Sequence, residues 1–312
     1  MNSLLEKESK QTDKILKPDF STKSGREFLA IYLYSKFKQI LNYDKNSEAP
    51  IFQKIHPDFI PKFTRRLINN PEKHILIGIS GESASGKTTI CNTIKQATER
   101  LNMPIEILSA DNYFRDISDL IKKHGSFDNL LASGFDVDSP DNFNLEQLFI
   151  DLEKLSRGED VRIPEYLVNG TGVVVPNAIP KKAKKVIVVE GMATMHGAVA
   201  DLFDVKLYVD VKPEIQEKWF LYRAQTSRNQ NEENARKQLA YVREASKKYI
   251  LPKKDASDII INGASSLEYF SQIIDYILCN KNLVHLLYCL CFLQLHFQQY
   301  LYILYRYLVL LL

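Results

Sequence analysis

The stretch that most constrains the fold of this chain is GESASGKT, residues 81–88, which matches the phosphate-loop pattern G-x-x-x-x-G-K-[ST]. An apolar run, HILIGIS, precedes it and a helix-like pattern follows it, so both flanks that the pattern requires are present. A Ser/Gly-rich turn with a solvated lysine would also explain these residues, but it would not require a strand before it and a helix after it. The sequence therefore predicts a strand, a phosphate-binding loop and a helix.

Polyphosphate chemistry explains the residue types of this loop. Backbone N–H groups surround phosphate oxygens where no Cβ blocks their approach, and a helix N-terminus favours negative charge. Lys87 is expected to reach the β- and γ-phosphates of a nucleotide, and the Thr88 hydroxyl is expected to ligate the accompanying Mg²⁺. The residues expected to bind the nucleotide are Gly81, Ser83, Ala84, Ser85, Gly86, Lys87, Thr88 and Thr89.

Apolar segments alternate with helical stretches along the middle of the chain. The expected strands cover residues 75–79, 105–108, 186–189, 205–209 and 259–261. They are short, continuous and rich in Ile and Val, as strands buried on both faces are. We therefore predict an α/β fold of the P-loop NTPase type, with a mostly parallel sheet flanked by helices.

The two ends of the chain differ from this middle part. With 312 residues the chain can hold one sizeable domain plus extensions. Residues 1–70 are expected to form an N-terminal helical extension, with a helix over 26–41 and a shorter one among the prolines of 57–71. Residues 71–265 are expected to form the phosphate-loop domain, and residues 266–312 a C-terminal helix and a hydrophobic tail.

The tail, residues 283–312, carries Arg306 as its only permanently charged side chain. Its length would allow a membrane span, for which about 20 apolar residues suffice. Polar side chains such as His296 and Gln299 interrupt it, and each costs free energy in lipid. A helix packed on the domain or on a second subunit is preferred, followed by sequence under no selection, and membrane association is not favoured.

Composition limits the partners of the chain. Lys/Arg and Asp/Glu nearly balance at a formal net charge of +3, without a polybasic run, so nucleic acid is not expected as a partner. The four cysteines form no Cys-x-x-Cys pair, and the charged first residues lack the apolar core of a secretory signal. We expect a cytoplasmic protein with a small-molecule substrate, and a homo-oligomer is left open.

Two acidic residues end expected strands. Asp111 closes the strand of ILSADNYF, and ligands of open α/β sheets sit at the carboxyl ends of parallel strands. Asp111 is a candidate general base for an alcohol, although the residues alone favour a helix cap equally. Glu190 closes VIVVEG and is a candidate Mg²⁺ ligand, acting through water.

Two arginines, Arg223 and Arg228, occur in WFLYRAQTSR after the expected strand at 205–209. Arginines on a mobile lid can neutralise the charge of a transferring phosphoryl group and exclude water from it. Solvated arginines are common on helices, so this pattern alone is a weak indication.

The order of the motifs resembles that of a known group of phosphate-loop kinases. The segments GISGESASGKTT, SADNYF, FDVDSPDNFN, RIPEY, VIVVEG, LYVDV and LPKKDASDIIING are similar to those of the uridine kinase, phosphoribulokinase and bacterial pantothenate kinase family, and their order is closest to uridine kinase. The resemblance covers about residues 75–263. It implies an ATP- and Mg²⁺-dependent kinase that phosphorylates a hydroxyl of a small metabolite, with a uridine- or cytidine-type nucleoside as the first expectation.

The same resemblance implies residue roles. Asp111 would be the catalytic base, and Lys87, Thr88 and Glu190 would organise ATP and Mg²⁺. Arg223 and Arg228 would be lid residues. The acceptor pocket would contain Tyr113, Asp138 and Tyr166.

The departures from the uridine kinase pattern keep other acceptors open. No histidine follows Tyr166 in YLVNGTGV, and Phe220 and Gln230 stand where that pattern has two arginines. The N-terminal extension and the pair Trp219-Phe220 resemble pantothenate kinases, so that acceptor or another small alcohol is the alternative. An alternative of another class is a nucleotide-binding regulatory or membrane-tethered module without turnover, although such a module has no use for a general base.

Overall fold

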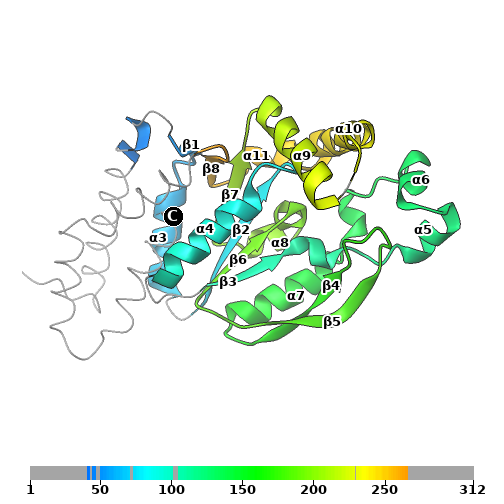
Figure 1. Cartoon of the computed structure of the whole chain (residues 1–312). Coiled ribbons are helices and arrows are strands. Elements are labelled where there is room, and N and C mark those ends of the chain that lie inside the picture. The colour runs from blue at the N-terminus through cyan, green and yellow to red at the C-terminus, as the bar shows by residue number, and fades with distance from the viewer. Residues whose placement is uncertain are drawn as a thin grey trace, which may run out of the picture.

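The computed structural model describes residues 41–42, 44–46, 50–70, 73–100, 105–228 and 230–265. A six-stranded sheet in the order β1-β8-β7-β2-β6-β3 forms the centre of this part. The parallel strands are β2 (Ile75–Gly81), β3 (Glu106–Ser109), β6 (Val186–Glu190), β7 (Val205–Asp210) and β8 (Ile259–Asn262) (Figure 1). All five expected strands, and with them the α/β fold class, are confirmed.

Helices cover the sheet on both faces. The chain moves one way along the sheet through α4 (Lys87–Arg100), from β2 to β3, and back through α7 (Leu145–Ser156), from β3 to β6. Right-handed crossovers therefore put α4 and α7 on opposite faces. The main core lies under α7 and α8 (Val199–Leu202) and includes Leu76, Leu108, Leu148, Leu152, Ile187, Val189 and Phe203.

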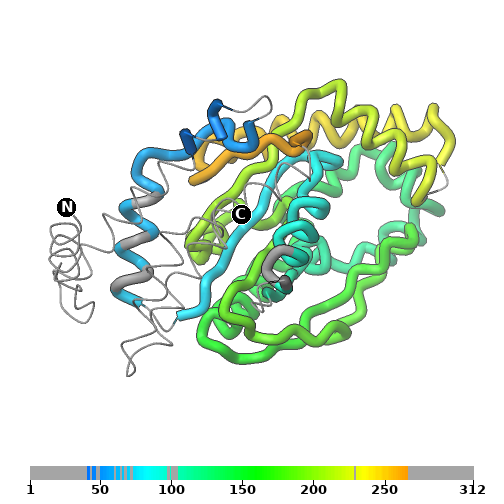
Figure 2. The backbone as a smooth tube through the Cα atoms, turned by 60° about the vertical axis from the view of Figure 1, so that its left-hand side comes forward, coloured from blue at the N-terminus to red at the C-terminus, as the bar shows by residue number. Residues whose placement is uncertain are grey.

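One edge of the sheet is built by a segment that precedes the phosphate loop. β1 (Phe52–Ile55) pairs antiparallel with β8, and Figure 2 shows this blue segment beside the orange one. α3 (Phe59–Asn69), the short helix expected among the prolines, follows it. Residues 52–55 thus form a strand where a helical extension over 1–70 was expected, because they pair with β8 and add an edge strand to the sheet.

Other parts of the expected ends lie outside the described residues. These parts are residues 1–40, which contain nearly all of the expected helix at 26–41, and residues 266–312, which contain the tail. Within the part that the structure does describe, no helix combines the length and the apolar character that a membrane span requires.

Two insertions between β3 and β6 extend beyond the sheet. The first contains α5 (Ser118–His124) and α6 (Phe127–Ala132), which share a small core of Ile117, Ile121 and Leu130. The second is an antiparallel hairpin of β4 (Val161–Tyr166) and β5 (Val174–Lys181), which the sequence did not predict (Figure 1). Two short 3₁₀ turns, η1 (Ala110–Tyr113) and η2 (Pro140–Asn142), complete this region, and a third, η3 (Met192–Met195), follows β6.

Two helices follow β7 and return the chain to the sheet. α9 (Pro213–Arg228) and α10 (Glu232–Tyr249) pack against each other, and α11 (Leu251–Lys254) leads back to β8 (Figure 1). α9 carries both arginines that the sequence assigned to a lid. Both helices contact the phosphate loop through side chains.

Candidate active site

The phosphate loop is held by close backbone approaches on two sides. A Cβ on Gly81 would lie 2.5 Å from the carbonyl oxygen of Val209 in β7, and Gly81 has a φ of 148°. A Cβ on Gly263, directly after β8, would overlap the carbonyl oxygen of Ser85 in the loop. Glycine is therefore needed at both positions, because the loop is fixed between β7 and the segment that follows β8.

Lys87 lies inside this loop. Its ammonium donates hydrogen bonds to the carbonyl oxygens of Gly81 at 2.9 Å and Glu82 at 2.8 Å. Burial lowers the pKa of Lys87, the charges of Glu190 and Asp111 oppose this shift, and Arg223 adds to it. The lysine expected to reach phosphate thus has two carboxylates and a guanidinium as electrostatic neighbours.

The two candidate Mg²⁺ ligands lie at adjoining points of the site. Thr88 is the second residue of α4, and Glu190 ends β6 opposite Ile79 of β2. Because Ile79 lies two residues before the phosphate loop, this pairing puts Glu190 close to the loop. Hydroxyl and carboxylate oxygens are ligands that Mg²⁺ prefers. The residues present fit a Mg²⁺ bound together with nucleotide phosphates, and Thr88 and Glu190 are the side chains that would hold it.

Asp111 lies between the phosphate loop and the expected acceptor residues. It lies in η1 directly after β3, and its Oδ1 is 3.0 Å from where a Cβ on Gly191 would stand. The charge of Asp111 acts on Lys87, Asp138 and Tyr166. The structure therefore brings Asp111 together with the phosphate-loop lysine and with two of the three expected acceptor residues.

Asp138 lies among carboxylates. Burial, followed by the charges of Asp111 and Asp136, raises the pKa of Asp138 to about 6. A tight turn holds the residue, since the Ser139 amide and the Asn142 side chain donate to the carbonyl oxygen of Asp136, at 3.1 Å and 2.7 Å. Asp138 is thus a fixed and easily protonated carboxyl group.

Tyr113 is placed differently from the sequence expectation. It is fully buried, and its hydroxyl donates to Oδ2 of buried Asp151 in α7 at 2.9 Å. Burial, followed by the Asp151 charge and hydrogen bond, raises the pKa of Tyr113. Tyr113 belongs to the main core, so its side chain is not available to an acceptor.

Phe114 takes the position that Tyr113 was expected to fill. Its ring centroid is 5.2 Å from that of Tyr166, whose pKa is raised by burial and by the Asp111 and Asp116 charges. The reason is local geometry, because residues i and i+3 of a 3₁₀ turn eclipse each other, which puts Phe114 on the side of Asp111.

The lid helix α9 contacts the phosphate loop through side chains. Arg223 Nη2 donates to Ser83 Oγ at 2.8 Å, and Gln216 Nε2, from a side chain only 2% exposed, donates to the Ser83 carbonyl at 3.1 Å. Arg228 is the last residue of α9, and its side chain lies outside the described part. Arg223 is thus brought to the loop, and Gln216 is a loop contact that the sequence did not reveal.

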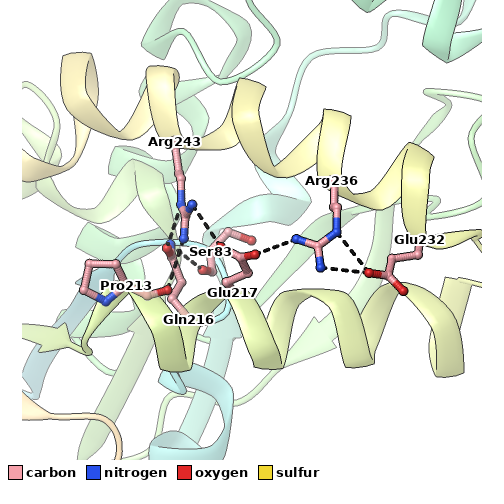
Figure 3. A network of polar contacts seen from close by, with 7 residues as sticks. All are labelled: Ser83, Pro213, Gln216, Glu217, Glu232, Arg236 and Arg243. Carbon is pink, nitrogen blue, oxygen red and sulfur yellow. Dashed lines mark hydrogen bonds and ion pairs between the residues drawn. The ribbon is translucent and has the colours of Figure 1, made fainter.

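Ion pairs join α9 to α10 (Figure 3). Glu217 of α9 accepts from Arg236 at 2.7 Å and lies 3.2 Å from Arg243, both on α10. Arg243 also donates to the carbonyl oxygen of Pro213 at 3.1 Å, and Arg236 pairs with Glu232 at 2.8 Å. Single exposed pairs contribute little to stability, but this network fixes the two helices relative to each other.

A phosphate loop with its lysine, two strand-end carboxylates beside it and an arginine-bearing helix above it define a phosphate-loop kinase. The chain belongs to the Phosphoribulokinase / Uridine kinase family, whose sequence model matches residues 76–268. It is an ATP-dependent kinase, and the family and enzyme class expected from the motifs are confirmed.

The proteins similar to this chain include a sequence relative and two solved structures. A uridine kinase of Staphylococcus aureus is 33% identical over 194 residues, which cover 61% of this chain and 88% of that protein. Among solved structures, a proposed fructose transport system kinase from Silicibacter sp. has a TM-score of 0.50 at 22% identity, covering 64% of this chain and 95% of that one. A phosphoribulokinase from Rhodobacter spheroides has a TM-score of 0.47 at 17% identity, covering 61% and 70%. At 22% identity the first structure shows a shared fold only.

Proposed function

We propose that this kinase transfers the γ-phosphate of ATP to a hydroxyl of a neutral nucleoside of the uridine or cytidine type. The observation that supports this acceptor is the charge around Asp138, on which the carboxylates of Asp111 and Asp136 act. An acceptor that carries its own carboxylate or phosphate would be repelled there, whereas neutral hydroxyls would donate hydrogen bonds to the carboxylates. Uridine and cytidine are neutral, while pantothenate, glycerate and ribulose 5-phosphate are anions.

The aromatic pair on the same side of Asp111 suits a flat base. The rings of Phe114 and Tyr166 are tilted by 44° at 5.2 Å, and both residues are half-buried. Such rings offer a nucleobase an apolar surface with the edge and face geometries that aromatic groups prefer. The similarity to a uridine kinase of Staphylococcus aureus supports the same acceptor class.

In the proposed reaction, Asp111 accepts the proton of the acceptor hydroxyl as that oxygen bonds to the γ-phosphorus. The bond from the γ-phosphorus to the bridging oxygen breaks, and ADP leaves with the bonding electrons. Lys87 and Arg223 neutralise negative charge on the transferred group. Thr88 and Glu190 would hold Mg²⁺, which supplies further charge neutralisation when bound.

Release of ADP, measured with five acceptors, tests the proposal. We expect turnover with uridine or cytidine and much slower turnover with pantothenate, glycerate and ribulose 5-phosphate. Asp111→Asn should lower kcat about 10²- to 10⁴-fold, because a general base is lost. Asp119→Asn is the matched control, since its carboxylate is 94% exposed on α5, and it should keep the wild-type rate.

Two results would contradict this function. Faster turnover of an anionic acceptor than of both nucleosides would refute the charge argument. Wild-type protein that binds ATP but turns over none of the five acceptors would favour the nucleotide-binding module over a nucleoside kinase.

A further inference from the structure

The last turn of α10 contacts both halves of the candidate site. Ser246, which is 3% exposed, donates from its hydroxyl to Glu82 Oε1 in the phosphate loop at 2.8 Å. Three residues later, the Tyr249 hydroxyl donates to Asp136 Oδ2, also at 2.8 Å. Residues three apart are neighbours on a helix surface. A single helical turn therefore joins the loop expected to bind ATP to the turn that carries Asp138.

Asp136, which accepts the Tyr249 hydrogen bond, belongs to an anchored turn. The carbonyl oxygen of Asp136 accepts from Asn142 at 2.7 Å, and the next residue, Val137, packs against the small core of α5 and α6. Asp138 lies between these anchored points, so the Asp136 carboxylate is the link from the turn to α10. Lys248 also donates to it at 3.2 Å from a side chain that is 61% exposed.

The side chain of Tyr249 packs against residues of the central sheet. Tyr249 packs against a buried cluster of Tyr208 in β7, Ile250 and Ile260 in β8. Its hydroxyl therefore donates to Asp136 from a ring that is held in place. A shift of α10 relative to the loop would change this hydrogen bond before it changed the packing of the ring, because hydrogen bonds depend steeply on geometry.

We propose that Tyr249 and Asp136 are positioning residues, which set the place of Asp138 relative to the phosphate loop. Nucleotide binding at the loop is transmitted through the bond of Glu82 to Ser246 and through the last turn of α10 to residues 135–143. The inference rests on the proposed function only in taking Asp138 as an acceptor residue.

Amide hydrogen exchange of residues 135–143, with and without Mg²⁺ and a non-hydrolysable ATP analogue, tests the transmission without any acceptor. In the wild-type protein the analogue should slow this exchange about three- to tenfold, the range expected for one hydrogen bond. In Tyr249→Phe the slowing should fall below about twofold while the analogue still binds. Tyr241→Phe removes a hydroxyl from a residue of the same helix that is 53% exposed, and this control should match the wild type.

Kinetics with uridine test the positioning role. Tyr249→Phe and Asp136→Asn should each raise KM for uridine about three- to tenfold and leave KM for ATP within about twofold. The second variant keeps the size of the side chain, and melting temperatures verify that both variants fold.

Equal slowing of exchange in the wild type and in Tyr249→Phe would overturn the proposal, as would no slowing in the wild type. A change in KM for ATP alone would also overturn it. If the wild-type protein does not phosphorylate uridine, the proposed acceptor is wrong, and the exchange experiment still decides the transmission.

Discussion

Replacement of Asp138 by Asn should stabilise the fold at neutral pH, and the gain should shrink as the pH falls. Burial and the charges of Asp111 and Asp136 raise the pKa of Asp138 from 3.8 to about 6 in the native state. The native state then binds the proton more tightly than the unfolded chain does, so the ionised carboxylate costs stability above pH 6. This cost falls as the pH drops from about 6 to about 3.8, and it is absent below both values.

The size of the gain follows from the pKa shift. A shift of about two pKa units corresponds to about 3 kcal/mol at about 1.36 kcal/mol per unit. Asp138 is only partly buried, so solvent screens its interactions, and we expect a gain of about 1–2 kcal/mol at pH 8. About half of this gain should remain at pH 5. Urea unfolding at several pH values measures the free energy of unfolding of both proteins.

Asp141→Asn is the matched control for this experiment. Asp141 lies three residues further along the same turn and is exposed, so its replacement should change the free energy of unfolding little. If Asp138→Asn lowers stability at pH 8, or if its gain is the same at pH 5 and pH 8, then Asp138 is not the crowded and desolvated carboxyl group described above. The stabilised variant should also bind uridine less tightly, because residues that serve a ligand are seldom optimal for stability.

Two further substitutions separate the phosphate site from the core. Lys87→Ala should abolish ADP release and weaken ATP binding without lowering the melting temperature, because it removes a buried ammonium and no core volume. Lys95→Ala, on the exposed side of α4, is the control. A wild-type rate of ADP release in Lys87→Ala would refute the phosphate-loop assignment. Tyr113→Phe should lower the free energy of unfolding by about 2 kcal/mol, since Asp151 loses a buried hydrogen bond, and should leave KM for uridine unchanged. A raised KM with unchanged stability would restore Tyr113 to the acceptor pocket.

The parts of the fold that the sequence predicted are those with a local cause. The five parallel strands are continuous apolar runs because both faces of the sheet are covered, and such runs are visible without any tertiary information. The strand β1 is not of this kind. Its residues Phe52 and Ile55 are only half-buried at a sheet edge, and their pairing partner in β8 lies some 200 residues later in the chain, at Ile259 to Ile261. The hairpin β4–β5 escaped prediction because its two strands are partly exposed and contain prolines, which are uncommon inside strands.

The residues of the candidate site also differ in whether the sequence could predict them. Lys87 could be predicted from the phosphate-loop pattern. Asp111 and Glu190 could be predicted because they lie at the ends of apolar strands, and parallel strands bring their carboxyl ends to one edge of the sheet. Tyr113 and Phe114 could not be separated by position after a strand, since both follow β3. The rotation of a 3₁₀ turn distinguishes them, and a sequence pattern does not show where such a turn begins.

The contacts of α9 and α10 with the loop are the least predictable part, and they explain why the acceptor is harder to assign than the nucleotide. Glu82 and Ser246 are 164 positions apart in the sequence, and Asp136 and Tyr249 are 113 positions apart. No short sequence motif could therefore predict either hydrogen bond. The nucleotide side of the site is one continuous stretch of chain, from β2 through the loop to α4. The proposed acceptor side combines η1, the turn after α6 and the end of β4, and in our proposal its geometry depends on how α10 is placed. If the proposal is right, substitutions at Asp136 or Tyr249 should alter acceptor specificity without any change in the phosphate loop.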